Sequence, residues 1–261
     1  MILRRFTTQL RRQDWTAVVV ELFVVVAGVF IGLQASNWNQ QREMDEKGAH
    51  FADSLNADLR AEAWGYEYQV HYYGNVLANA DRVMNALTGK APLSDETLLI
   101  SAFRATQYNE NTRHRATYDE LTSTGSIGLI RDPVLRETAM RLYTTNNLNN
   151  IAQEGRASPY RRLFRMTVPN DVQRSLEKNC GDRVAVVGDY KTNFADAINY
   201  PCSTGLSEDA IAASVAALRG NPDLVPLLRL RVVDLESNVA NLLVYEGDIH
   251  TALRDFMKEQ R

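Results

Sequence analysis

The sequence has few of the residues from which catalytic and metal sites are built. It contains four histidines and two cysteines in 261 residues. No HExxH, GxSxG, P-loop or GxGxxG spacing occurs. His50 and His71 lie 21 residues apart on one expected helix and cannot share a metal ion, and only antiparallel pairing of the long helices would bring His250 near either of them. We therefore expect no enzyme activity, no cofactor and no metal site.

An excess of charge of either sign is also missing. The 29 lysines and arginines nearly balance the 32 aspartates and glutamates, which leaves a net charge of −3. A nucleic-acid-binding domain of this size usually carries a basic field, so we expect no nucleic-acid partner. Hydrophobic residues make up 45% of the chain, which is enough for a substantial buried core.

Only one long apolar run occurs. Residues 17–33 read AVVVELFVVVAGVFIGL, in which Glu21 is the single charged residue. From Trp15 to Trp38 a helix would be about 36 Å long, which exceeds the roughly 30 Å of bilayer hydrocarbon. The two tryptophans lie where interfacial anchors are expected. The run predicts a transmembrane helix over residues 15–38.

The charges around this run predict its orientation. Four arginines precede it within residues 1–14, whereas acidic and basic residues are mixed after it. The positive-inside rule then gives a cytoplasmic basic tail (1–14) and an outer domain (39–261), which is periplasmic in a bacterial inner membrane. Residues 2–12 suit either a short interfacial helix or a plain basic tail.

A cleaved signal peptide is the alternative interpretation of the apolar run. The basic start and the apolar stretch fit that class of segment. However, Leu33 would occupy position −3 of a site ending at Ala35, where a small residue is required, and Glu21 would lie inside the apolar region. We therefore favour a retained membrane helix.

Three residues inside the run indicate a possible contact with another membrane helix. Gly28 and Gly32 form a GxxxG pair, which allows two helix backbones to approach closely. Glu21 either lies near the inner interface, where it reaches basic residues or headgroups, or contacts another membrane subunit.

The outer domain has the period of α-helices, and two long apolar seams stand out. One covers residues 44–87, and no proline interrupts the chain from 16 to 90. The other covers 228–256 in a 4-3-4-3 spacing, with Glu246 as its only polar member; Pro226 leaves its start open between Asn221 and Asp223. We predict an all-α fold in which the membrane helix continues into an antiparallel helical bundle.

Shorter helices are expected between the two seams. They cover residues 95 onward after the N-cap Ser94, 116–124 ended by Gly125, 133–153, 159–178 with a break at Pro169, and a helix that Ser207 caps and that ends at Gly220. Residues 184–187 favour a strand by composition, but one isolated strand does not make a sheet.

Two further groups are candidate sites. Cys180 and Cys202 are the only cysteines, and outside the cytoplasm such a pair is expected to form a disulfide, which would contribute about 3 kcal/mol by closing its loop. Five aromatic residues crowd the first outer helix and either line a ligand pocket or interface, or simply fill the core. They are Trp64, Tyr66, Tyr68, Tyr72 and Tyr73.

Two segments resemble the signatures of a bacterial family of single-pass inner-membrane proteins. One is VVVELFVVVAGVFIGLQASNWNQQR over residues 18–42, and the other is RATYDELTSTGSIGLIRDPVLRETAMRLY over 115–143. The resemblance covers about a fifth of the chain and implies the topology given above. The family has no assigned activity, so the resemblance implies no catalytic residue.

These observations predict a non-enzymatic, membrane-anchored interaction or scaffold protein, such as an accessory subunit of a larger envelope complex. Its expected partners are the lipid bilayer and other membrane subunits or a second copy of itself. The alternative is a periplasmic ligand-sensing module, which would need a separate partner because only about 14 residues remain for the cytoplasm.

Overall fold

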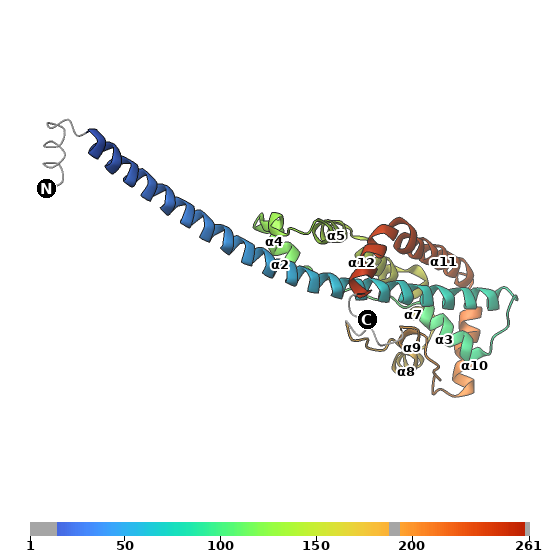
Figure 1. The fold of residues 1–261 in the computed structure, drawn as a ribbon. Helices are drawn as coiled ribbons and strands as arrows, with labels where there is room; N and C mark the ends of the chain where they lie inside the picture. The colour runs from blue at the N-terminus through green and yellow to red at the C-terminus, as the bar shows by residue number, and fades with distance from the viewer. Residues whose placement is uncertain (1–14, 188–193, 259–261) are drawn as a thin grey trace.

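The computed structural model describes residues 15–187 and 194–258, and within these ranges every regular element is helical (Figure 1). The predicted all-α class is confirmed. The predicted basic tail, with its possible interfacial helix over 2–12, lies outside the described residues.

One helix, α2, runs from Trp15 to Leu87 and forms the axis of the molecule. Its 73 residues correspond to about 110 Å at 1.5 Å per residue. It bends gently along its whole length and has no sharp kink (Figure 1), as expected for a helix without an internal proline. It ends just before Gly89, whose φ of 76° is a left-handed conformation that glycine adopts without strain. The predicted continuity of the apolar run with the outer helix is confirmed.

The other helices surround the second half of α2. In chain order they are α3 (Asp95–Ala105), α4 (Ala116–Ser123), the 3₁₀ turn η1 (Ser126–Leu129), α5 (Pro133–Thr144), α6 (Asn147–Ala157), α7 (Pro159–Thr167), α8 (Asn170–Cys180), α9 (Phe194–Ile198), α10 (Glu208–Arg219), α11 (Leu224–Ala240), the π-helical turn η2 (Asn241–Tyr245) and α12 (Gly247–Lys258).

The core forms where α11 runs back along α2, antiparallel to it, and α12 crosses α2 (Figure 1). Leu55 and Leu59 of α2 and Leu228 and Leu235 of α11 are fully buried, as both predicted seams require. Burial extends beyond the seam of α2, because Trp64, Tyr68 and Tyr72 are also covered. The helix is therefore enclosed on several sides and is the central element of the bundle.

The predicted helix starts are confirmed where a side-chain cap was identified. Ser94 accepts a hydrogen bond from the Thr97 amide, and Ser207 accepts one from Ala210. Gly125, with φ of 69°, follows α4 as expected. Helix α11 begins at Leu224 after Asp223, the later of the two predicted starts, so that Pro226 lies in the first turn, where its missing amide hydrogen costs no helical hydrogen bond.

The prediction of one helix over 133–153 is wrong. The chain forms α5 and α6, with Thr145 extended between them (ψ of 142°). The Thr145 hydroxyl and the Asn147 side-chain amide both donate to one carboxylate oxygen of Glu246, at 2.5 and 2.8 Å. Glu246 is only 6% exposed, so its carboxylate needs hydrogen-bond partners. The chain leaves helical geometry at Thr145, where it supplies two of them.

The C-terminal seam is likewise not one regular helix. Its side chains face the core as predicted, but α11 passes through η2 before α12 begins at Gly247. The Tyr66 hydroxyl lies at this turn, 2.9 Å from the Leu242 carbonyl oxygen and 3.0 Å from Glu246 Oε2. A tyrosine hydroxyl and a carboxylate inside an apolar seam thus coincide with the irregular turn.

Substitution of Gly48 should locate the point where α2 enters the bundle. A Cβ atom at this position would lie 2.9 Å from the backbone oxygen of Leu129, whereas one at Gly74 would meet nothing within 4 Å. We expect Gly48→Ala to lower the free energy of unfolding by about 1–3 kcal/mol through overpacking. Gly74→Ala should raise it by about 0.5–1 kcal/mol. Chemical denaturation of both variants measures the difference, and equal effects would contradict the described packing.

Candidate functional site

The apolar run forms the uncovered part of α2. Its large side chains are exposed, for example Phe23 at 72% and Ile31 at 66%, and no residue of the run is buried. In the described residues, α2 is the one helix long and apolar enough to cross a membrane; a signal sequence near the N-terminus would share these properties. A continuous apolar surface of this kind requires lipid or protein to cover it.

The predicted membrane-contact residues share one side of this helix. Glu21, Gly28 and Gly32 are separated by seven and four residues, which is two turns and then one turn. A Cβ atom on either glycine would meet nothing within 4 Å, and Glu21 is exposed. Val19 and Val26 lie on the opposite side. This side of the run carries the carboxylate and both glycines, with Val25 between them, and the opposite side has only bulky residues near Val19 and Val26.

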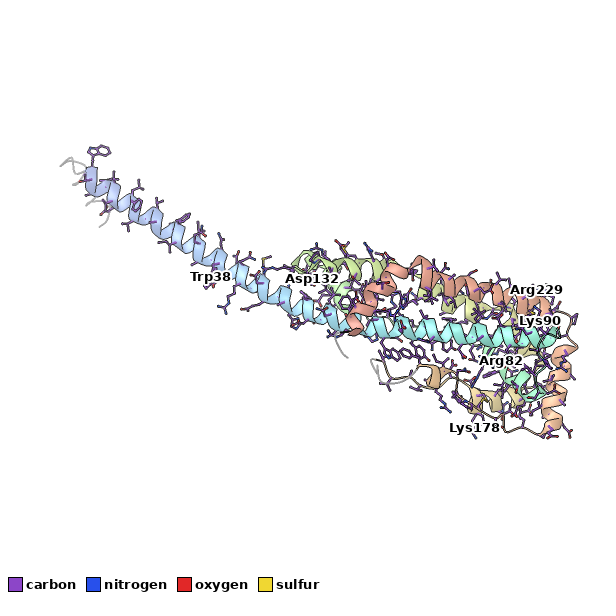
Figure 2. All side chains as sticks on the ribbon, turned by 45° about the vertical axis from the view of Figure 1, so that its right-hand side comes forward. Trp38, Arg82, Lys90, Asp132, Lys178 and Arg229 are labelled. Atoms are coloured by element: carbon purple, nitrogen blue, oxygen red, sulfur yellow. A yellow bond between two sulfur atoms is a disulfide. The ribbon has the colours of Figure 1, made fainter. Side chains whose placement is uncertain are left out.

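The two predicted anchors mark the ends of the run. Trp15 and Trp38 are 66% and 65% exposed, and Figure 2 shows Trp38 on the part of α2 that the bundle does not cover. The first buried residue after them is Gly48. About 15 Å of helix therefore separates Trp38 from the first buried residue, and this mostly bare segment meets the bundle only through the Asp45 side chain among the contacts described.

This bare segment is strengthened by polar side chains. The Arg42 guanidinium lies 3.0 Å from a carboxylate oxygen of Glu46, one turn ahead. Gln41 donates to Asp45 at 2.8 Å, and Arg131 from the bundle pairs with the same aspartate. Exposed pairs of this type contribute only a few tenths of a kcal/mol each, but they favour the helical state of the connection.

The aromatic residues of α2 point in several directions. Tyr66 faces η2, the Tyr72 hydroxyl donates to Asp182 at 2.6 Å, and the Tyr73 hydroxyl donates to the Asn109 carbonyl oxygen at 3.1 Å. Burial raises the pKa of Tyr73 to about 12 and raises the pKa of the Asp182 carboxyl above its ordinary range. These three tyrosines pack in the core and bind neighbouring segments, as the core-packing interpretation predicts.

The remaining two aromatic residues border a cavity. The rings of Trp64 and Tyr68 stack at 5.3 Å and form one wall of a space of about 240 Å³ between α2, the 109–114 loop and residues 183–187. Two polar atoms that belong to lining residues, Gln69 Oε1 and Asn111 Nδ2, are buried and make no hydrogen bond to any described residue. One is an acceptor and the other is a donor. The cavity therefore has an aromatic wall, and two of its lining residues each carry one unsatisfied polar atom buried beneath its surface.

The predicted disulfide is present and lies in a polar network. Cys180 and Cys202 are joined, with Cα atoms 5.5 Å apart. The buried Arg104 guanidinium donates to the carbonyl oxygens of Cys180 and Tyr200, at 3.4 and 2.9 Å. Glu96 accepts from the Thr204 amide at 2.8 Å, just beyond the disulfide. The loop closed by the disulfide is thus also attached to α3 at two points.

Two acidic residues of the core were not predicted as sites. Glu62 accepts from Arg113 Nε at 3.0 Å, and burial raises the pKa of Glu62 above its ordinary range although Arg113 opposes that rise. Glu67 lies between two histidines, 2.7 Å from His250 Nε2 and 3.6 Å from His71 Nε2. In residues 15–187 and 194–258, no group of three or more histidine, cysteine, aspartate or glutamate side chains is arranged to hold a metal ion.

The sequence carried a signal for one of these two acidic residues, because Glu62 is a polar residue at a position of an apolar seam. Glu62 occupies a position of the α2 seam at which apolar residues are expected, as Glu246 does in the second seam. Glu67 and His71 are one turn apart on α2, which is an ordinary helical spacing, and only the packing of α12 on α2 brings His250 to them.

Comparisons of the chain with protein-family models, with curated protein sequences and with solved structures found no match.

The hydrogen bonds between Glu96 of α3 and Thr204 predict that the attachment of the disulfide-linked segment to α3 depends on pH. Hydrogen bonds from the Thr204 amide and hydroxyl hold the pKa of Glu96 below its ordinary value. A carboxylate with a depressed folded-state pKa stabilises the fold above its ordinary pKa, and this contribution is lost as the pH falls through the folded-state pKa. We expect Glu96→Gln to lower the melting temperature at about pH 7 and to have little effect at about pH 3.

Thermal unfolding of the full chain at both pH values measures this difference. Glu120→Gln is the matched control, because the Glu120 side chain makes no hydrogen bond in the described ranges. An equal loss for Glu96→Gln at both pH values would contradict the assignment.

Proposed function

We propose that this chain is a non-enzymatic, membrane-anchored interaction protein that acts as an accessory subunit of a larger complex in a bacterial inner membrane. The observation that carries the proposal is the continuity of α2, which joins the uncovered apolar run to the bundle core without a break. In this arrangement residues 15–38 span the membrane, 1–14 are cytoplasmic and 39–261 are periplasmic.

Three properties of the chain support this placement. The apolar run has exposed side chains on all sides, which lipid would cover. The arginines concentrated before it favour a cytoplasmic N-terminus. The disulfide between Cys180 and Cys202 is of a kind that persists in the oxidising periplasm and is rare in the cytoplasm. The resemblance of residues 18–42 and 115–143 to an inner-membrane family agrees with the same placement.

The side of the run that carries the carboxylate and both glycines is the proposed surface for a protein partner. A carboxylate within a membrane helix is costly unless it meets water or a polar partner, so Glu21 favours an orientation toward another subunit or toward the interface. Gly28 and Gly32 lie on the same side and leave room for the backbone of a second helix. A partner helix on this face would fix the rotation of α2 and thereby the direction in which the bundle points.

A second function, ligand sensing through a separate partner, is favoured by one specific observation. Two residues that line the cavity beside Trp64 and Tyr68 carry buried polar atoms without partners in the described residues, an acceptor on Gln69 and a donor on Asn111. Buried polar atoms of this kind are ordinarily satisfied, so a ligand or water with the complementary groups is expected to occupy the cavity.

The substitution Gly28→Leu tests the proposed membrane interface. The space around Gly28 is empty within this chain, so Gly28→Leu should leave its own fold intact while it separates a partner helix. We expect about tenfold less of the complex after extraction in mild detergent, as measured by native mass spectrometry, since packing of this kind contributes roughly 1–2 kcal/mol. Val26→Leu, on the opposite face, is the matched control and should retain the complex. Recovery of only a monomer from the unmodified chain would count against the proposal.

Binding of benzamide tests the proposed ligand-sensing function. Its amide group carries both an acceptor and a donor, which are the groups that complement Asn111 Nδ2 and Gln69 Oε1. We expect saturable binding by calorimetry that Asn111→Ala weakens by about two- to tenfold, the contribution of one hydrogen bond. Asn149→Ala, at an exposed position of α6, should bind as the unmodified chain does. Unchanged affinity in Asn111→Ala would exclude this cavity as the binding site.

A further inference from the structure

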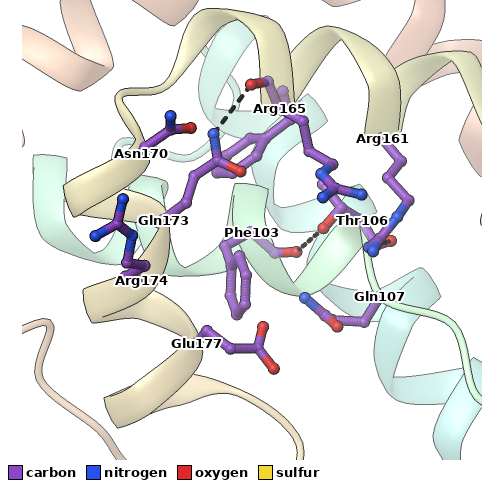
Figure 3. Close-up of a pocket in the computed structure, with 10 residues that line it drawn as sticks. Phe103, Thr106, Gln107, Arg161, Arg165, Asn170, Gln173, Arg174 and Glu177 are labelled. Atoms are coloured by element: carbon purple, nitrogen blue, oxygen red, sulfur yellow. Dashed lines mark hydrogen bonds between the residues drawn. The ribbon is translucent and has the colours of Figure 1, made fainter.

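A second hollow lies between α3, α7 and α8, on the part of the bundle far from the apolar run (Figures 1 and 3). It encloses about 280 Å³, which is close to the lower limit of about 300 Å³ for small-molecule pockets. The end of α3 forms one wall, and α7 and α8 form the others. Helices α7 and α8 follow one another in the sequence, whereas α3 is far from both and meets them only through tertiary packing.

The residues that line this hollow carry an excess of positive charge. Three of its lining residues are arginines, Arg161, Arg165 and Arg174, and Glu177 is the single acidic one. The local excess of positive charge contrasts with the net charge of −3 for the whole chain. An excess of cations around a partly enclosed space attracts anions into it.

The three arginines differ in how they are used. Arg161 is committed to the fold, because its guanidinium donates to the Thr106 carbonyl oxygen at 3.0 Å and lies 4.8 Å from the centre of the Tyr108 ring. The guanidinium groups of Arg165 and Arg174 donate no hydrogen bond and form no ion pair within the described part of the chain. Two cations therefore border the hollow with their donors available.

Neutral groups complete the lining. Asn170 and Gln107 supply side-chain amides, and Gln173 donates to the Arg165 carbonyl oxygen at 3.0 Å, which joins α7 to α8 (Figure 3). Phe103 and Phe164 lie at the base with ring centres 6.2 Å apart, and both are almost fully buried. The hollow therefore combines cationic donors at its rim with an aromatic base.

We propose that this hollow binds a small organic anion, attracted by Arg165 and Arg174 on opposite sides of its rim (Figure 3), with its apolar part directed toward Phe103 and Phe164. Arginine suits this role because its planar fork of donors matches the geometry of carboxylate and phosphate oxygens. The charge of Arg161 agrees with this assignment: burial, and to a lesser extent the like charge of Arg165, lowers the pKa of Arg161, and a bound anion would offset that repulsion.

This site is independent of the proposed membrane interface and of the cavity beside Trp64. It shares no lining residue with that cavity, and it requires no partner chain. Loss of the membrane partner would leave anion binding unchanged, and loss of anion binding would leave the membrane complex intact.

Calorimetry on the full chain in a non-ionic detergent tests the proposal. The probes are benzoate and inorganic phosphate, with benzyl alcohol as the neutral counterpart of benzoate. We expect saturable binding of both anions that weakens as salt is added, and no comparable binding of the alcohol. Arg165→Gln and Arg174→Gln should each weaken benzoate about tenfold, which corresponds to about 1.4 kcal/mol.

Arg162→Gln is the matched control, because Arg162 is exposed on the same helix and does not line the hollow. It removes the same charge from the chain and should leave the affinity unchanged. Three results would overturn the proposal: no binding of either anion, equal binding of benzoate and benzyl alcohol, or an equal loss in Arg162→Gln. Circular dichroism of each variant shows whether the helical fold is retained.

Discussion

The structure depends on the packing of an entire bundle around one uninterrupted helix. Leu55, Leu59, Tyr66, Val76 and Val83 are nearly or fully buried along α2, and most of the other helices contact it directly. Without this axis, the short helices that follow would have no common core, because helices of 8–12 residues are marginal in isolation. The same element also carries the exposed apolar run, so the anchor and the core are parts of one covalent and hydrogen-bonded unit.

Buried polar groups then determine where the surrounding helices begin and end. Glu246 divides α5 from α6 and ends the π-helical turn η2, where Tyr66 also binds it. Arg231, only 2% exposed, donates to the carbonyl oxygens of Ala105 and Gln107 at the end of α3. Helix ends leave carbonyl groups without helical partners, and buried side chains satisfy them here. Hydrophobic burial stabilises the bundle, while these polar contacts specify where its helices begin and end.

Much of this architecture was predictable from the sequence because it depends on local signals. The two apolar seams, the absence of proline from 16 to 90 and the caps at Ser94 and Ser207 are all properties of neighbouring residues. The disulfide was predictable because the chain offers only one cysteine pair. The break at Thr145 was not, because its cause is a carboxylate about 100 residues away. The arginine-lined hollow was not predictable either: along the sequence, Arg165 and Arg174 resemble ordinary solvated charges, and only the packing of α3 against α7 and α8 forms the hollow that they border.

The bare segment between Trp38 and Gly48 has a mechanical consequence. Because α2 continues through it, the bundle cannot swivel on a flexible linker. In the proposed membrane orientation, about 75 Å of rigid helix extends from Trp38 to Leu87. A tilt of about 20° from the membrane normal, ordinary for a single helix, displaces the far end sideways by roughly 25 Å. A bilayer of different thickness, or a partner that changes the tilt, therefore moves the arginine-lined end of the molecule across the membrane surface.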